Sequence, residues 1–216
     1  AMAVLRPIKL TITNYPEGQS ETFQVENNPN DPAAGTRSVT FSRHLYVEEE
    51  DFMEQPIPKY KRLYPEGPEC RLKGAYLITC TGCVKDESGR VVEILATYDP
   101  DSSGGNPADG RKVRGATIHW VDASTAVDAQ VRLYDNLFAD ENPDGGDKDF
   151  LDCLNPGSLE VLEGCKLEAS LAAAQPADRF QFLRLGYFCA DSKDSKPGAL
   201  VFNRAVSLKD GFKPGK

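Results

Sequence analysis

Apolar and polar residues alternate in short runs along most of the chain, which is the pattern of β-strands with one face in a core. The clearest pair of runs, 75–85 and 91–98, flanks the turn sequence Asp-Glu-Ser-Gly at 86–89 and predicts a β-hairpin. Further strands are predicted at 4–13, 22–25, 37–47, 111–121, 131–138, 159–165, 179–189 and 199–208. Helix is limited to predicted turns at 48–53, 149–154 and 170–175. Many short strands with frequent turn signals predict an all-β protein built as barrels or sandwiches.

A shift in composition after Trp120 divides this pattern into two units, which we expect to meet near residue 122. Hydrophobic residues make up 40% of the 216 positions, enough for packed cores. The opening residues fit an internal segment, so the chain is expected to be a piece of a longer protein. With no long apolar run and no signal sequence at the start, a cytoplasmic protein without a membrane partner is predicted.

The net charge of -8 disfavours nonspecific binding to nucleic acid, because phosphates repel an acidic surface. Within 59–76 the balance is reversed, and tyrosines stand among the cations. The residues of this segment that matter are Lys59, Tyr60, Lys61, Arg62, Tyr64, Arg71, Lys73 and Tyr76. Cations that neutralise phosphates, next to aromatic faces that stack on bases, suit single-stranded nucleic acid. Composition alone also allows a second interpretation, in which these are solvated residues at strand ends.

Six cysteines leave three possibilities open. Cys80 and Cys83 have the spacing of a zinc knuckle, but no second close pair exists and the only histidines are His44 and His119. In a regular strand, residues three apart also point to opposite faces. Disulfides are the second possibility, and free thiols in a reducing cytosol are the one we favour.

No phosphate-binding glycine loop, nucleophile elbow, zinc-protease motif or carboxylate pair is present. His119 and Trp120 lie in an apolar strand pattern and are predicted to pack in a core. The inventory therefore predicts a binding module, with no catalytic residues and no metal or cofactor in this chain.

Gly-Arg-Lys-Val-Arg-Gly-Ala-Thr-Ile-His-Trp-Val at 110–121, followed by Val-Arg-Leu-Tyr-Asp-Asn-Leu-Phe at 131–138, resembles the carboxy-terminal anticodon-binding half of glutaminyl-tRNA synthetases. Shorter matches run in order through the chain, at 3–4, 7–10, 27–30, 35–37, 60–63, 71–72, 75–76, 97–99, 107–110, 180–182, 186–189, 191–192 and 201–204. The related glutamyl-tRNA synthetases of the archaeal and eukaryotic type are the nearest alternative. Phe-Gln-Phe at 180–182 and Phe-Asn-Arg at 202–204 favour the glutaminyl branch.

The resemblance implies two consecutive β-barrels with a few short helices. The first would span 1–121 and the second 122–200, with 201–216 forming a strand and tail that return to the first barrel. It also implies a monomeric part of a class I glutamine–tRNA ligase, with the tRNA-Gln anticodon loop as partner. The catalytic domain, which uses ATP with Mg, would lie outside this chain, so the chain alone should be inactive.

Site residues follow from the resemblance position by position. Lys61, Arg62 and Arg71 match positions against the first and third anticodon bases, and Gln181 and Arg184 match positions at the middle base. Weaker matches are Asn30, Lys59, Tyr60 and Lys73, with Arg111, Lys112 and Arg114 as possible backbone contacts. Arginine can donate to a guanine or cytosine edge, while glutamine both donates and accepts, which suits uracil.

Several positions depart from the family pattern. Lys59 stands where members carry Gln, Lys73 stands where they carry Arg, and the 62–71 loop is about one residue longer. A family Arg aimed at the middle base would lie just before Ala1. A standalone β-barrel protein-interaction module, whose basic patch is only a solvated face, remains the alternative from another functional class.

Overall fold

The computed structural model describes residues 1–28, 30–143, 145 and 149–208. Its strands are β1 Ala3–Val4, β2 Pro7–Ile12, β3 Ser20–Glu26, β4 Thr36–Ser42, β5 His44–Glu48, β6 Cys70–Leu72, β7 Leu77–Lys85, β8 Val91–Tyr98, β9 Thr117–Ile118, β10 Val121–Asp122, β11 Val127–Tyr134, β12 Leu159–Leu167, β13 Arg179–Phe182, β14 Gly186–Ala190 and β15 Leu200–Ser207. The helical elements are 3-10 turns: η1 Pro32–Ala34, η2 Glu49–Asp51, η3 Pro100–Ser102, η4 Phe150–Cys153 and η5 Ala169–Ala173. The predicted all-β fold is confirmed.

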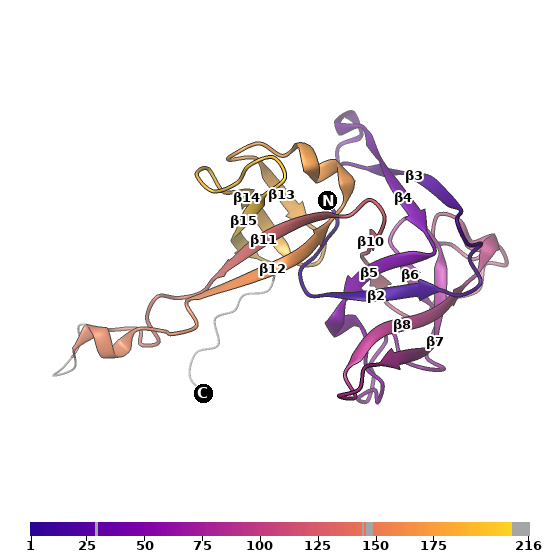
Figure 1. Cartoon of the computed structure of the whole chain (residues 1–216), viewed down its shortest axis with the longest axis horizontal. Coiled ribbons are helices and arrows are strands. Elements are labelled where there is room, and N and C mark those ends of the chain that lie inside the picture. The colour runs from indigo at the N-terminus through magenta and orange to yellow at the C-terminus, as the bar shows by residue number, and fades with distance from the viewer. Residues whose placement is uncertain (29, 144, 146–148, 209–216) are drawn as a thin grey trace.

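Two curled, barrel-like sheets hold most of these strands (Figure 1). The seven-stranded sheet has the order β10-β5-β2-β8-β7-β6-β9, and β3 with β4 forms a two-stranded sheet beside it. The six-stranded sheet has the order β1-β12-β11-β15-β14-β13. The chain begins between the two halves, and the β11–β12 ribbon extends away from both (Figure 1).

Each half has its own hydrophobic core. In the first, Trp120 and Phe41 are fully buried with ring centroids 5.2 Å apart. In the second, Phe182 stacks on Phe188 at 4.3 Å. The strand alternation produces these cores, because every second side chain of a strand points to the same face. His119 is buried too, which confirms the interpretation of His119 and Trp120 as core residues.

Four predicted strands are interrupted. The 4–13 run contains the end of β1 and all of β2, which lie in different sheets. The 37–47 run is two strands in different sheets, β4 and β5, separated at Arg43, whose Nη1 donates to the Tyr15 carbonyl at 2.8 Å. The 179–189 run is the hairpin β13–β14. Residues 111–116 form no strand, and β9 begins only at Thr117.

The last described strand does not join the first half as expected. β15 lies in the six-stranded sheet, parallel to β11 and antiparallel to β14. Its apolar alternation can pair with any strand of suitable register, so the sequence did not specify its neighbours. At the other end of the chain, β1 lies in the six-stranded sheet as well, where it pairs with β12. Residues 209–216 lie outside the described residues, and the domain boundary at 121–122 stays a prediction.

All six cysteines are free thiols, and Cys70, Cys80, Cys153 and Cys165 are buried. The expected opposite orientation of Cys80 and Cys83 is wrong. A β-bulge between Cys80 and Gly82 shifts the register, so the two cysteines pair with Ala96 and Ile94, which share a face. Within the described ranges, no three His, Cys, Asp or Glu side chains are grouped to hold a metal ion. Nor do those ranges contain a helix with the length and apolar character needed to cross a bilayer.

Candidate nucleic-acid interface

Backbone pairing brings several of the predicted basic residues onto neighbouring segments. β6 and β9 run parallel with Arg71 opposite Thr117. The Ala116 N–H donates to the Lys61 carbonyl at 2.7 Å, and the Lys73 N–H donates to the Ile118 carbonyl at 2.9 Å. Three segments distant in sequence, around 61, 71–73 and 114–118, therefore lie side by side.

Gly115 makes this close approach possible. A Cβ at Gly115 would lie 2.2 Å from the Glu69 carbonyl oxygen and 2.7 Å from the Cys70 Sγ. Burial raises the pKa of the Cys70 thiol to about 12, so it stays protonated, and its Sγ lies 3.6 Å from the Lys61 carbonyl oxygen. Gly115, which has no side chain, and the neutral Cys70 thiol together allow the backbone beneath the basic segments to pack closely.

Arg62 and Tyr60 bind a second feature, the acidic turn η2. The Tyr60 hydroxyl donates to the Glu50 carbonyl at 3.0 Å, and burial raises the pKa of Tyr60 to about 12. Arg62 Nη1 lies 3.1 Å from Asp51 Oδ1 and 3.3 Å from Glu50 Oε1. The Asp51 side chain is 0% exposed, whereas that of Glu50 is 70% exposed. Asp51 is therefore the principal anion for Arg62.

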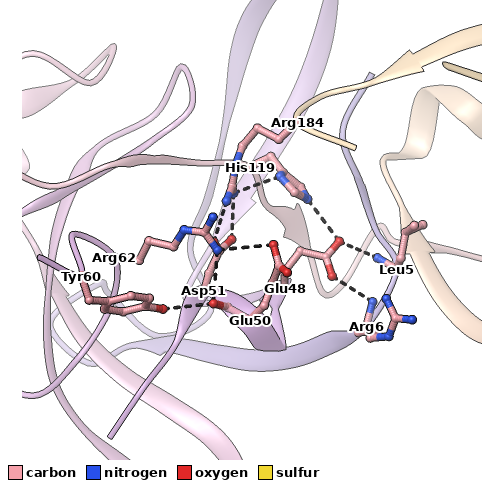
Figure 2. A network of polar contacts seen from close by, with 9 residues as sticks. All are labelled: Leu5, Arg6, Glu48, Glu50, Asp51, Tyr60, Arg62, His119 and Arg184. Carbon is pink, nitrogen blue, oxygen red and sulfur yellow. Dashed lines mark hydrogen bonds and ion pairs between the residues drawn. The ribbon is translucent and has the colours of Figure 1, made fainter. Parts of the chain in front are cut away.

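Arg184 reaches the same carboxylate from the other half. Its Nη1 and Nη2 donate to Asp51 Oδ2 and Oδ1 at 2.8 and 2.6 Å (Figure 2). It lies in the β13–β14 turn with φ 69°, a left-handed conformation uncommon outside glycine. Burial opposes the charge of Arg184, but the hydrogen bonds and charge of Asp51 outweigh it and raise its pKa. Two candidate residues from different halves of the molecule thus share one buried anion.

His119 and Glu48 continue this network. Arg184 Nη1 lies 3.2 Å from His119 Nδ1, and His119 Nε2 lies 3.4 Å from Glu48 Oε1 (Figure 2). Since arginine only donates, Nδ1 accepts and Nε2 carries the proton. Glu48 also accepts from the N–H groups of Leu5 and Arg6 at 2.8 and 3.0 Å. Burial opposes ionisation of Glu48, yet these bonds hold its pKa below the usual value.

The remaining arginines of the predicted site differ in availability. Arg71 Nε donates to the Gly105 carbonyl, so the loop after η3 holds it. Arg111 pairs with three carboxylates, Glu69, Asp99 and Asp109, and the bond to Glu69 contributes most to raising its pKa. With its charge balanced locally, Arg111 fastens its loop and is poorly suited to a phosphate.

The other predicted contacts are exposed and do not form a single cluster. Five of these candidates make no ion pair with another described residue: Lys59, Lys61, Lys73, Lys112 and Arg114. Gln181 is exposed on β13, where its carbonyl accepts from the Ala1 nitrogen at 2.8 Å. The Asn30 N–H donates to Asn28 Oδ1 at 3.0 Å in an exposed loop. Neither side chain bonds another candidate within the described part of the chain.

The acidic partners are what the sequence-based prediction missed. The run at 48–51 was predicted only as part of a helical turn, with no role in the site, yet Glu48 and Asp51 are buried and belong to the network that binds the candidate residues. The run directly follows the buried Val47 and precedes the half-buried Phe52, which is the one local signal of burial.

Comparison with known proteins shows which family the chain belongs to. Two sequence models described as "tRNA synthetases class I (E and Q), anti-codon binding domain" match residues 1–99 and 117–191. The chain belongs to this family. The two matched segments are the ones that carry Arg62 and Arg184.

Several curated relatives that match this chain are glutamine–tRNA ligases. Those of Clostridium kluyveri and Pseudomonas putida are each 54% identical over 98% of this chain, and that of Bordetella pertussis is 55% identical over 98%. The matched regions are 38%, 37% and 36% of those proteins. The chain thus spans a little over a third of the length of these relatives.

Proposed function

We propose that this chain reads the anticodon loop of tRNA-Gln within a glutamine–tRNA ligase, whose catalytic domain lies in the remaining sequence. One observation carries the proposal: the two family-matched segments meet at Asp51, where Arg62 of the first and Arg184 of the second lie together. A site built from both halves can hold unstacked bases apart and bind their Watson–Crick edges.

The proposed division of labour follows from the availability of donors. Arg62 reads a base edge, Lys61 and Arg71 serve the first and third anticodon bases with it, and Gln181 serves the middle base. Exposed Lys59, Lys73, Lys112 and Arg114 contact phosphates, with Tyr60 and Asn30 at the margin. We propose no such role for Arg111, because its three carboxylates already balance its charge.

ATP and Mg belong to the catalytic part of the proposed enzyme, which would act as a cytoplasmic monomer. No described group of three or more His, Cys, Asp or Glu side chains fits a metal here. This chain contributes tRNA selection and no chemical step.

Binding of an anticodon stem-loop tests the proposal. The chain should bind a fluorescent tRNA-Gln stem-loop, more weakly as salt rises, because cations that contact phosphates displace counterions. A stem-loop with scrambled anticodon bases should bind at least tenfold more weakly, given about 1–3 kcal/mol for each good base contact. Equal affinity for both loops would reject base reading by this chain.

The glutamyl branch is a second candidate, because the matching family models cover both E and Q enzymes. A tRNA-Glu stem-loop in the same assay separates the two. Tighter binding of the tRNA-Glu loop would favour the glutamyl branch, while tighter binding of the tRNA-Gln loop supports the proposal.

A further inference from the structure

We infer that Asp51 is a positioning residue for anticodon reading: it holds Arg62 and Arg184 so that Arg62 presents its free Nε–Nη2 edge to the RNA. The inference rests on the proposed function and adds a residue that the family resemblance did not indicate.

The backbone fixes Asp51 relative to Arg62. The Leu63 N–H donates to the Asp51 carbonyl at 3.0 Å, and the Met53 N–H donates to the Leu63 carbonyl at 3.1 Å. Phe52 and Leu63 form a parallel bridge between these bonds. The carboxylate of Asp51 and the stem of Arg62 therefore lie on two tied segments, and their separation is set by the fold.

The hydrogen-bond donors are divided unequally between the two arginines. A guanidinium has five N–H groups in a planar fork. Arg184 binds Asp51 with both Nη1 and Nη2, so its end-on edge is occupied. Arg62 approaches Asp51 and Glu50 with Nη1 alone, and its Nε and Nη2 bond no other described residue. Arg62 therefore keeps a two-donor edge that matches guanine O6 and N7 or two phosphate oxygens.

Charge also favours Arg62 as the residue that faces the RNA. Two guanidinium groups share the single buried charge of Asp51, and the third partner, Glu50, is 70% exposed and screened by water. Arg71 makes a useful comparison, because Gly105 already occupies its Nε. Within the arginines of 59–76, Arg62 is the one with an unoccupied Nε–Nη2 edge.

Asp51→Asn in the 216-residue chain tests the inference, because it keeps the shape of the side chain and removes its charge. We expect discrimination between cognate and scrambled stem-loops to fall about tenfold. Affinity for the scrambled loop should hold or rise, since a negative charge is lost. In an Arg62→Ala background, the same change should cause no further loss. The matched control is Glu50→Gln, which removes the exposed neighbour and should change discrimination less than twofold.

Two results would overturn the inference: full discrimination by Asp51→Asn, or an equal loss in the Arg62→Ala background. If Asp51→Asn fails to fold, NMR of the arginine Nε–H groups in the unmodified chain decides. Saturation with the cognate loop should shift the Arg62 Nε–H signal, and an unshifted signal would refute the positioning role. Failure of the unmodified chain itself to discriminate loops would instead reject the proposed function.

Discussion

Arg184 and Asp51 form a two-point ion pair across the junction of the two sheets, with N–O distances of 2.8 and 2.6 Å. Arg62 binds the same carboxylate from the segment that follows η2. The pair therefore joins the halves of the molecule and the proposed reading residues at once. Its loss should affect both folding and binding.

Replacing Asp51 with Ala should lower the free energy of unfolding by about 2–4 kcal/mol, because it leaves two partly buried guanidinium groups without their anion. Their side chains are 30% and 28% exposed, so solvent offsets part of the cost. Urea unfolding monitored by tryptophan fluorescence measures the change. Glu54→Ala is the control: its pair with Lys85 is on the surface and should contribute less than about 1 kcal/mol. Equal losses in both variants would contradict a central role for Asp51.

Glu48 predicts a dependence of stability on acid pH. Its folded pKa lies below the ordinary 4.5, so its contribution is complete above pH 4.5 and is lost as pH falls through the folded pKa. Glu48→Gln should cost about 1–3 kcal/mol near neutral pH, and the difference from the unmodified chain should shrink in acid. Urea unfolding between pH 3 and 7 measures this. The same substitution at the exposed Glu17 is the control, and its stability difference from the unmodified chain should not shrink in acid. A stability difference for Glu48→Gln that stays constant with pH would refute the role given to Glu48.

Gly115→Ala tests the close backbone packing around Gly115, beneath the basic segments. The added Cβ would collide with the Glu69 carbonyl at 2.2 Å, so we expect a loss of about 1–3 kcal/mol in unfolding free energy. Gly82→Ala is the matched control, because a Cβ there meets nothing within 4 Å. Thermal unfolding of the two variants should separate them clearly. Similar melting temperatures would mean that the 111–116 segment moves aside without cost.

Arg62→Ala and Lys112→Ala should affect RNA binding in different ways. Loss of the Arg62 edge should cost about 1–3 kcal/mol of discrimination against a scrambled anticodon. Loss of the Lys112 side chain should weaken the binding of both loops alike. It should also reduce the slope of log affinity against log salt concentration by about one. Anisotropy titrations at several salt concentrations measure both quantities. If Arg62→Ala lowers the affinity for the cognate and the scrambled loop equally, Arg62 does not read bases.

Local alternation was sufficient to predict the β class and the hairpin β7–β8, because a strand with one buried face carries its period in its own sequence. It could not predict partners. β15 alternates like the other strands, yet its place between β11 and β14 depends on contacts with distant segments. Residues 111–116 look like a strand as well, but they form none, and β9 begins only at Thr117.

Only the basic residues of the candidate site could be predicted from the sequence. Arginines and lysines near tyrosines are visible in sequence, and the family resemblance assigns them positions. The carboxylate that organises Arg62 and Arg184 is not visible, because Asp51 is 133 residues from Arg184 and sits in a run of acids that looks solvated. Burial of a single acid in such a run depends on the packing of the whole junction.

The most direct test of the account is a crystal structure of this chain with the tRNA-Gln anticodon stem-loop. The anticodon bases should lie between the 59–73 segment and the β13–β14 hairpin, with Arg62 Nε and Nη2 on RNA acceptors and Arg184 still paired with Asp51. RNA bound to another face, or an Arg62 edge left in solvent, would contradict it.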